Sequence, residues 1–466
     1  MKKIPLFLFV LLVYSCISLN AQQYEIKVNI PDYPGKRAYL ALLQGDESVL
    51  VDSTAVSNGK IEFLFDEEKA PGLYRLFLSD PTHSQMRRRE PVHFDFIFNR
   101  ENIELMSSYL SLIKDMVIFR SEENKKYFDF LRLKSDYRRH LSLLLPLTEV
   151  YDSTDSFFSP LRKELLNIQL DYNDSLVKLA NTDPHMLVSS LIALNREPVF
   201  DPGKHENLTG FMIENYLTTV SFTDERLLNT NAITQKVISY LSFYRGQEMN
   251  RQEQEKAFIR AVDKIMEQVS YNQEIYDFVL DYLIDGFEQF QMEEVLVHIA
   301  DNHLTGECKT ESEEIAKERL EAYQRMAPGK KVPDINLLDP FDTPHRLSSL
   351  ENEMILLIFW SSECPHCTNL LPRLNKWYNK EKENYDLGIY TVSIDDSRIE
   401  WEEFILMNEL DWTNVYDPEG WESTTSQRYN IYATPTMFLL NNDLKIVAKP
   451  VTFRDARQAI EDGLKL

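Results

Sequence analysis

Two cysteines near the end of the chain, Cys364 and Cys367, are the side chains whose type and spacing best suit chemistry. Only Pro365 and His366 separate them. Two thiols this close can bind a metal ion, cross-link the fold, or alternate between dithiol and disulfide as electrons pass through them. The segments on either side of the pair indicate which of these roles to expect.

The pair lies where a predicted strand gives way to a predicted helix. Residues Met354–Trp360 form an unbroken apolar run, as in a buried parallel strand, and Thr368–Tyr378 has helical spacing. The N-terminus of a helix presents unpaired N–H groups and a partial positive charge, which stabilise a thiolate. We therefore expect Cys364 to be the nucleophile.

The second cysteine, Cys367, is placed to resolve a mixed disulfide formed by the first. It lies on the next helical turn, and the loop between the two is too short for an ordinary structural cross-link. Pro365 stiffens the turn, and His366 can add positive charge near the Cys364 thiolate. Both residues are predicted to lower the pKa of Cys364 and to make the pair more oxidising.

Other uses of these cysteines fit the sequence less well. A closed zinc site needs four ligands, but there is no second pair of this spacing, and Cys308 with His303 is a poorly spaced candidate. We predict neither a metal nor a cofactor. A peroxiredoxin would carry threonine three residues and proline seven residues before the nucleophile, where this chain has Ser361 and Leu357.

Composition places these cysteines in a large, acidic, folded protein. A chain of 466 residues is too long for one ordinary core, and its 43% hydrophobic content argues against general disorder. The formal net charge of −24 argues against binding to nucleic acid or to anionic lipid head groups, because both need clustered Lys and Arg.

Residues 1–21 are predicted to be an export signal. Two lysines precede an apolar run from Ile4 to Tyr14, which is too short to span a bilayer. Cleavage near Ala21 and lipid attachment at Cys16 are both open. Either way, we expect the periplasm or cell envelope of a bacterium, where a thiol pair can persist as a disulfide.

Three further regions follow, and the predicted architecture is multidomain. Residues 22–99 alternate with period two between turn signals, which predicts a small antiparallel β-sandwich. Residues 100–327 have helical spacing; Asn250 with Glu253 is a predicted N-cap, and Asp183 with Pro184 a predicted helix start. The break "PGKKVPD" opens residues 328–466, where strands and helices alternate as in one α/β domain.

The last region resembles thioredoxin-fold proteins. The segment "MILLIFWSSECPHCTNLLPRLNKWY" is similar to their active-site strand and helix, including Pro372, and "YNIYATPTMFLLNNDLKIV" to the segment that carries their cis-proline, here Pro435 after Thr434. Between them, "IYTVSIDDSRIEWEEFILMNELDWTNVYDPEGW" resembles the central insertion of the TlpA and ResA group of exported thiol-disulfide oxidoreductases, and "APGKKVPDINLLDP" the start of that domain.

The resemblance implies a thioredoxin-like fold with a central insertion and an enzyme that exchanges disulfides. Cys364 and Cys367 would be catalytic, and Thr434, Pro435 and Trp360 would contact the substrate, with the backbone of Thr434 pairing with an extended strand. Expected partners are proteins with cysteines and a membrane-linked redox protein of a Gram-negative envelope.

Two departures from the family leave the direction of electron flow open. Thioredoxins place a buried aspartate where this chain has Ile358, so proton transfer falls to solvent, to Glu363 or to an acid of the insertion. The Pro-His dipeptide is that of the oxidant DsbA, whereas TlpA-like domains usually reduce. We expect a reductase; the alternatives are an oxidase or isomerase, and a binding or assembly protein with an auxiliary redox domain.

Overall fold

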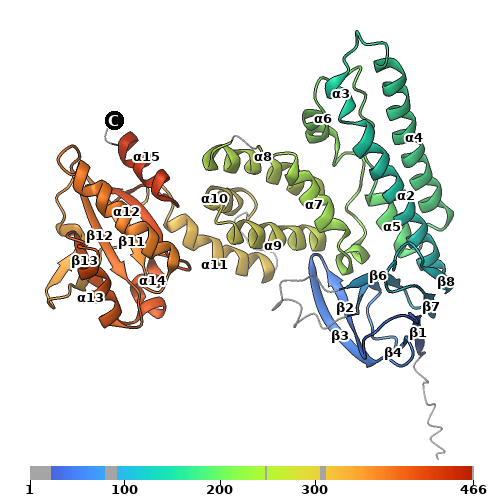
Figure 1. The fold of residues 1–466 in the computed structure, drawn as a ribbon, viewed down its shortest axis with the longest axis horizontal. Helices are drawn as coiled ribbons and strands as arrows, with labels where there is room; N and C mark the ends of the chain where they lie inside the picture. Colours follow the sequence, from blue (N-terminus) through green and yellow to red (C-terminus); the bar gives the residue numbers. More distant parts are fainter. Residues whose placement is uncertain (1–21, 79–91, 247–248, 305–310, 464–466) are drawn as a thin grey trace, which may run out of the picture. The chain divides into compact units, whose positions relative to one another are not determined.

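Two β-sheets, a series of helices and a third sheet with its own helices follow one another along the chain (Figure 1). This computed structural model describes residues 22–78, 92–246, 249–304 and 311–463. The predicted export signal and Cys308 lie outside the described residues, as does Cys16.

The first region forms a sandwich of two four-stranded sheets. One sheet has the order β4-β1-β7-β8, and the other β3-β2-β5-β6. Phe65 of the first sheet contacts Tyr74 and Phe98 of the second, so aromatic rings fill the space between them. The strands are β1 Tyr24–Asn29, β2 Arg37–Gln44, β3 Glu47–Ala55, β4 Lys60–Phe65, β5 Gly72–Phe77, β6 His93–Phe98, β7 Ile103–Met106 and β8 Val117–Arg120.

The sandwich departs from the prediction in two respects. Its β1 and β7 pair in parallel, so it is not wholly antiparallel. Because β7 and β8 belong to its first sheet, it also extends to Arg120 and not to residue 99. These strands are only four residues long and are separated by turns, so they offer too few residues for a period-two pattern to emerge.

The middle region is helical, as predicted, and one predicted cap is confirmed in detail. The Asn250 side chain accepts a hydrogen bond from the N–H of Glu253 at 3.0 Å, and the Glu253 carboxylate accepts one from the N–H of Asn250 at 2.9 Å. The helices are α2 Glu122–Leu144, α3 Leu147–Val150, α4 Phe158–Thr182, α5 Leu187–Leu194, α6 Leu208–Asn215, α7 Ala232–Ser242, α8 Arg251–Val269, α9 Gln273–Gln289, α10 Glu293–Asn302 and α11 Glu311–Arg325.

The helix start predicted at Asp183 is wrong. Asp183 is the C-cap of α4, and α5 begins only at Leu187 after the N-cap Met186. Asp followed by Pro is common at a helix start but also suits the residues after a helix end, because proline cannot continue a helix.

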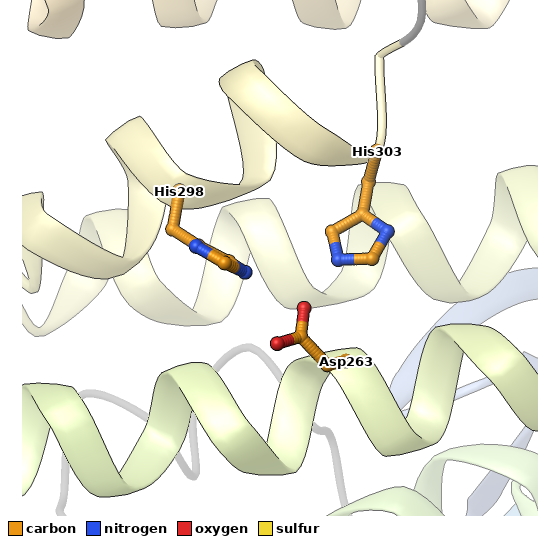
Figure 2. Close-up of side chains that lie close together, drawn as sticks. All are labelled: Asp263, His298 and His303. Atoms are coloured by element: carbon orange, nitrogen blue, oxygen red, sulfur yellow. The ribbon is translucent and has the colours of Figure 1, made fainter.

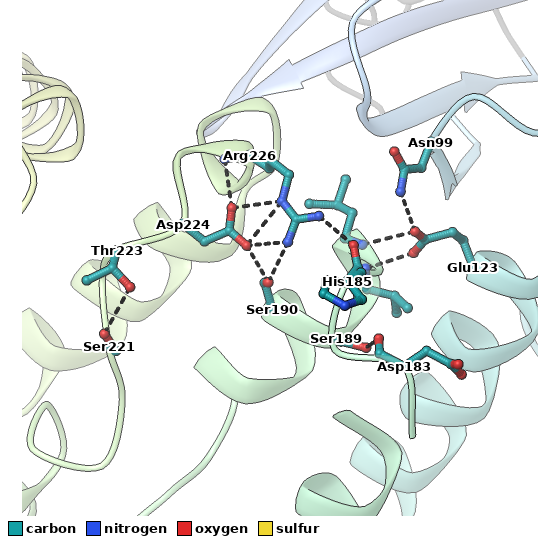
Figure 3. A network of polar contacts seen from close by, with 12 residues as sticks. Asn99, Glu123, Asp183, His185, Ser189, Ser190, Ser221, Thr223, Asp224 and Arg226 are labelled. Atoms are coloured by element: carbon teal, nitrogen blue, oxygen red, sulfur yellow. Dashed lines mark hydrogen bonds and ion pairs between the residues drawn. The ribbon is translucent and has the colours of Figure 1, made fainter. Parts of the chain in front are cut away.

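A buried carboxylate joins the first sandwich to the helices. Glu123, on α2, accepts a hydrogen bond from the Asn99 side chain at 2.6 Å and from the N–H groups of Leu187 and Val188 at 2.9 and 2.8 Å (Figure 3). The first N–H groups of a helix have no partner within it, so Glu123 caps α5 from outside.

Two units emerge from the contacts within the chain. The first includes residues up to Gln247 with Asp263–Val279, and the second Glu248–Val262 with Leu280–Leu466. The second unit thus takes in helical residues before the boundary we predicted at 328. For α11 two contacts account for this: the buried Met326, just after the helix, belongs to the core of the last sheet, and Tyr323 packs against Tyr432.

The last region is built on a seven-stranded sheet of order β10-β9-β13-β12-β11-β14-β15. The strand before the cysteines, β11, lies inside the sheet and runs parallel to β12 and antiparallel to β14. Its bounds, Met354–Trp360, are those predicted from the sequence. The remaining elements are β9 Asn336–Leu338, β10 Pro344–Arg346, β12 Leu387–Ser393, β13 Thr413–Tyr416, β14 Thr436–Asn441, β15 Ile446–Ala448, α12 Pro365–Glu381, α13 Arg398–Met407, α14 Thr424–Arg428 and α15 Phe453–Gly463.

Both faces of β11 are covered, which explains its unbroken apolar sequence. Leu356 and Ile358 point into a core shared with α12, α13 and α15, whereas Leu357 and Phe359 point into a core formed with the start of the domain and Tyr429. The protein is therefore multidomain, with N-terminal β-sheets, a helical middle region and a C-terminal thioredoxin-like α/β domain, as predicted.

Candidate active site

The cysteine pair lies at the junction of β11 and α12. Cys364 is the N-cap of α12, and its sulfur accepts a hydrogen bond from the N–H of Cys367 at 3.4 Å. Cys364 is partly exposed, whereas Cys367 is fully buried, and both are free thiols. One sulfur can therefore meet another protein, and the other can meet only its neighbour.

The two thiols differ in acidity in the direction that a nucleophile and a resolving residue require. Burial by itself raises the pKa of Cys364, but hydrogen bonds from Cys367, from Thr434 and from the backbone of His366 outweigh it, so the net pKa is lowered. Burial, followed by the hydrogen bond to Cys364, raises the pKa of Cys367 to about 12. Cys364 is thus the thiol that ionises first.

The predicted cis-proline segment lies against the nucleophile. The Thr434–Pro435 peptide bond is cis, and the Cys364 S–H donates to the Thr434 carbonyl oxygen at 3.3 Å. The structure therefore brings together the two segments that the sequence places far apart.

The two residues between the cysteines are both exposed, and the backbone of each contributes to the turn. Pro365 is the first residue of α12, where its missing N–H costs no hydrogen bond and its fixed φ suits a helix. His366 contributes to the lowered pKa of Cys364 through its backbone N–H. That its side-chain charge also acts on the thiolate stays a prediction.

The prediction that Trp360 contacts the substrate is wrong. Trp360 is fully buried and packs against Phe404 of α13 with a ring-centroid distance of 5.1 Å. A tryptophan directly before an active-site turn suggests an exposed contact, but here it is still part of β11, whose two faces are both covered.

One functional candidate, Asp395, was missed as an individual residue. The position at which thioredoxins have an aspartate is occupied by the fully buried Ile358, so β11 supplies no acid there. Asp395, which follows the neighbouring strand β12, is an acid that is only 2% exposed. Its carboxylate accepts from the Ser361 hydroxyl at 2.7 Å and from the N–H of Ser362 at 2.6 Å. The usable signal was its place after a buried parallel strand, because the carboxyl ends of such strands meet at one edge.

Potential metal ligands and a cavity elsewhere in the chain do not change the assignment of the candidate active site to Cys364 and Cys367. In the described part of the chain, one group of three, Asp263, His298 and His303, has candidate ligand atoms within 4.8 Å of one another (Figure 2). Asp263 falls in the first unit and the histidines in the second, so no metal site is assigned to them. A cavity of about 920 Å³ is lined by residues such as Lys331 and Arg428 and not by the cysteines.

Two protein families match separate parts of the chain. Residues 328–449 match the AhpC/TSA family, and residues 24–127 match a domain of unknown function, DUF4369. The second match ends close to β8, in agreement with the extent of the sandwich.

The similar proteins of known type are disulfide-exchange enzymes. The thiol-disulfide oxidoreductase ResA of Bacillus thuringiensis is 25% identical over 142 residues, which are 30% of this chain and 79% of that protein. The sporulation thiol-disulfide oxidoreductase A of Bacillus subtilis is 31% identical over 94 residues, 20% of this chain and 54% of that protein.

Solved structures with similar chains come from bacteria as well. The thioredoxin domain of a thiol-disulfide oxidoreductase from Bacteroides vulgatus is 27% identical and covers 29% of this chain and 96% of its own, with a TM-score of 0.28. A thioredoxin-like protein from Bacteroides caccae is 19% identical and covers 55% and 92%, with a TM-score of 0.44. From the AhpC/TSA match and the ResA relatives, residues 328–449 form a thioredoxin-fold domain that is similar to the AhpC/TSA family, and the protein is a thiol-disulfide oxidoreductase.

Proposed function

We propose that this protein reduces disulfides of other proteins in the bacterial cell envelope through a dithiol and disulfide cycle of Cys364 and Cys367. The observation that carries the proposal is the asymmetry of the pair. Cys364 is partly exposed with a lowered pKa, and Cys367 is buried with a raised one. Disulfide exchange through this pair needs the asymmetry, because the exposed sulfur must react with the substrate and the buried sulfur must then resolve the mixed disulfide. The reverse reaction uses the same asymmetry.

The reaction begins with the Cys364 thiolate, which attacks one sulfur of a substrate disulfide. A bond forms between Cys364 and that sulfur, the substrate S–S bond breaks, and the other substrate sulfur leaves as a thiolate that takes up a proton. Cys367 then loses its proton and attacks Cys364, which releases the second substrate thiol. Two electrons pass to the substrate, and the pair is left as a disulfide.

The substrate is proposed to be an extended cysteine-containing segment of a protein. Such a segment would pair with the backbone of Thr434, next to Pro435, in the manner of an added β-strand. The Thr434 carbonyl that now accepts the Cys364 S–H at 3.3 Å supports this, because it places backbone hydrogen-bonding groups beside the reacting sulfur.

An envelope location and a membrane-linked donor complete the proposal. The apolar run within residues 1–21 supports export, with Cys16 as the site of a possible lipid anchor. In the described residues, no helix is long and apolar enough to cross a membrane. A reduced partner at the membrane would return the Cys364–Cys367 disulfide to the dithiol after each cycle.

The reverse direction is the second candidate, and the Pro365-His366 dipeptide favours it. About 30 mV corresponds to roughly 1.4 kcal/mol for this two-electron couple, so small local effects can reverse the direction. Thiol trapping in intact cells separates the two: a pair found mostly reduced supports the reductase, and a pair found mostly oxidised supports the oxidase.

The deciding experiment is to trap the mixed disulfide with Cys367→Ser. This variant keeps the nucleophile but cannot resolve the intermediate, so substrate proteins should accumulate in complexes that dissociate with dithiothreitol. The matched control is the double variant Cys364→Ser/Cys367→Ser, which should form none at this pair. Equal amounts of complex from both variants would overturn the proposed cycle.

A further inference from the structure

The turn that carries the nucleophile is hydrogen-bonded to one buried carboxylate, that of Asp395. Oδ1 of Asp395 accepts three hydrogen bonds from the turn: from the Ser361 hydroxyl at 2.7 Å, the Ser362 N–H at 2.6 Å and the Ser362 hydroxyl at 2.9 Å. Oδ2 accepts from the Ser393 hydroxyl at 2.6 Å, at the end of β12. Each of its oxygens thus accepts at least one hydrogen bond, and Asp395 itself is only 2% exposed.

Ser361 connects this carboxylate to both sulfur-bearing residues. Its carbonyl oxygen accepts from the N–H of Cys364 at 3.2 Å. Its backbone N–H is among the groups that favour the thiolate of Cys367, against the larger effect of burial. Its hydroxyl accepts from the N–H of Glu363 at 3.1 Å. A shift of Ser361 would therefore reach Cys364 and Cys367 at the same time.

The charge around Asp395 is mostly negative. Asp396 is next to it and exposed, and the buried Asp417 lies after β13. Tyr416 of β13 has a raised pKa, first because it is desolvated and next because of the charge of Asp395. The cation on the neighbouring helix, Arg398, is paired with Asp342 and Glu402. The Asp395 carboxylate therefore lies behind the active-site turn, among groups that are mostly acidic.

We propose that Asp395 is a positioning residue of the disulfide exchange, which fixes the turn at Ser361 and Ser362 and sets the ease with which the cysteine pair ionises and becomes oxidised. Asp395 supplies the buried carboxylate that β11 lacks at Ile358, but it follows the neighbouring strand β12 and acts on the cysteines by holding the turn. The inference rests on the proposed cycle of Cys364 and Cys367.

The test compares Asp395→Asn with Asp396→Asn in the full-length protein. The first removes a buried charge but keeps the size of the side chain and one acceptor oxygen. The second removes the same charge one residue further on, where it is exposed to solvent. Two measurements are needed: the pH dependence of Cys364 alkylation by iodoacetamide, followed by peptide mass spectrometry, and the equilibrium of the pair with glutathione.

We expect Asp395→Asn to alkylate about threefold faster at pH 7, because a like charge near a thiol disfavours its thiolate. Asp395→Ala, which also releases the turn, should change the equilibrium constant with glutathione about tenfold, or about 30 mV. Asp396→Asn should match the native protein in both measurements.

A purely structural residue would lower the unfolding temperature and leave both measurements unchanged. If Asp395→Asn and Asp396→Asn give the same alkylation profile and the same equilibrium constant as the native protein, the inference is overturned. If the Asp395 variants do not fold, Ser361→Ala removes one bond to the carboxylate, and an unchanged profile there overturns it equally. Neither readout needs a natural substrate, so failure of the trapping experiment is a separate result.

Discussion

Each of the two units of this protein contains a buried carboxylate, and the two carboxylates bind different kinds of hydrogen-bond donor. In the first unit, Glu123 is 3% exposed and accepts hydrogen bonds from Asn99 and from the first N–H groups of α5. In the second, Asp395 is equally buried but accepts from the turn that carries the nucleophile. Burial of a charge is costly in either place, so each must be satisfied by donors.

The difference lies in what the donors belong to. The donors to Glu123 are the first two N–H groups of α5 and the side chain of Asn99, which follows β6, so loss of this carboxylate should lower the stability of the first unit. Three of the four donor groups that bind the Asp395 carboxylate belong to Ser361 and Ser362, within three residues of Cys364, so loss of this carboxylate should change the reactivity of the cysteine pair. Burial alone therefore does not identify a functional residue; the position of its partners does.

Removal of the nucleophile gives the largest expected effect. It tests whether the active-site turn of the second unit carries the chemistry. Cys364→Ala should abolish the reduction of insulin disulfides by dithiothreitol-recharged protein, because no other described thiol is both exposed and acidic. The unfolding temperature should change little, since the side chain is only partly buried. Substantial residual activity would place the reacting thiol elsewhere in the chain.

Removal of the structural carboxylate should affect stability alone. Glu123→Ala leaves three donors without their acceptor, and we expect the free energy of unfolding of the first unit to fall by about 3 kcal/mol. Glu122→Ala is the matched control, because that side chain is exposed and forms an ion pair with Lys125 at the surface. Chemical denaturation measures the free energy of unfolding of both variants.

Insulin reduction should be unchanged in Glu123→Ala under conditions where the protein stays folded. A loss of activity in the folded variant would contradict the division of roles between the units.

The pH dependence of alkylation sharpens the contrast within the cysteine pair. Because the pKa of Cys364 lies below the ordinary value of 9.0, its alkylation rate should reach half of its maximum below pH 9. Cys367, with a pKa raised to about 12, should stay unmodified over the same range. In Cys367→Ser the profile of Cys364 should change, since a sulfur no longer contributes a hydrogen bond to it. Equal reactivity of both cysteines would contradict the proposed order.

Removal of the confirmed helix cap gives the smallest expected effect. Asn250→Ala removes the acceptor for the Glu253 N–H at the start of α8, and caps of this kind contribute about 1 kcal/mol. Urea denaturation measures the change in the free energy of unfolding. The control is Gln252→Ala, because Gln252 is exposed in the first turn of α8. An effect as large as that of Glu123→Ala would show that the cap does more than complete one helix.

Sequence patterns located the elements of the last region well because their signals are local. The apolar run of β11 and the helical spacing after the cysteines depend on neighbouring residues only, and the structure has a strand at Met354–Trp360 and a helix at Pro365–Glu381. The same local reasoning failed at Asp183, where one dipeptide suits either end of a helix, and at β7 and β8, which are too short for a period to show.

The sequence by itself determined the α/β class of the last domain and the place of Cys364 and Cys367 between a strand and a helix, because motif spacing and apolar periodicity are properties of the chain. The cis-proline segment came from the resemblance to thioredoxin-fold proteins. Only the tertiary structure decided that Trp360 is buried, that Cys367 is the sheltered thiol and that Asp395 supports the turn. These depend on which strands are neighbours. The parallel pairing of Trp360 with Ser393 places the ends of β11 and β12 together, although 33 residues separate Ser362 from Asp395 along the chain.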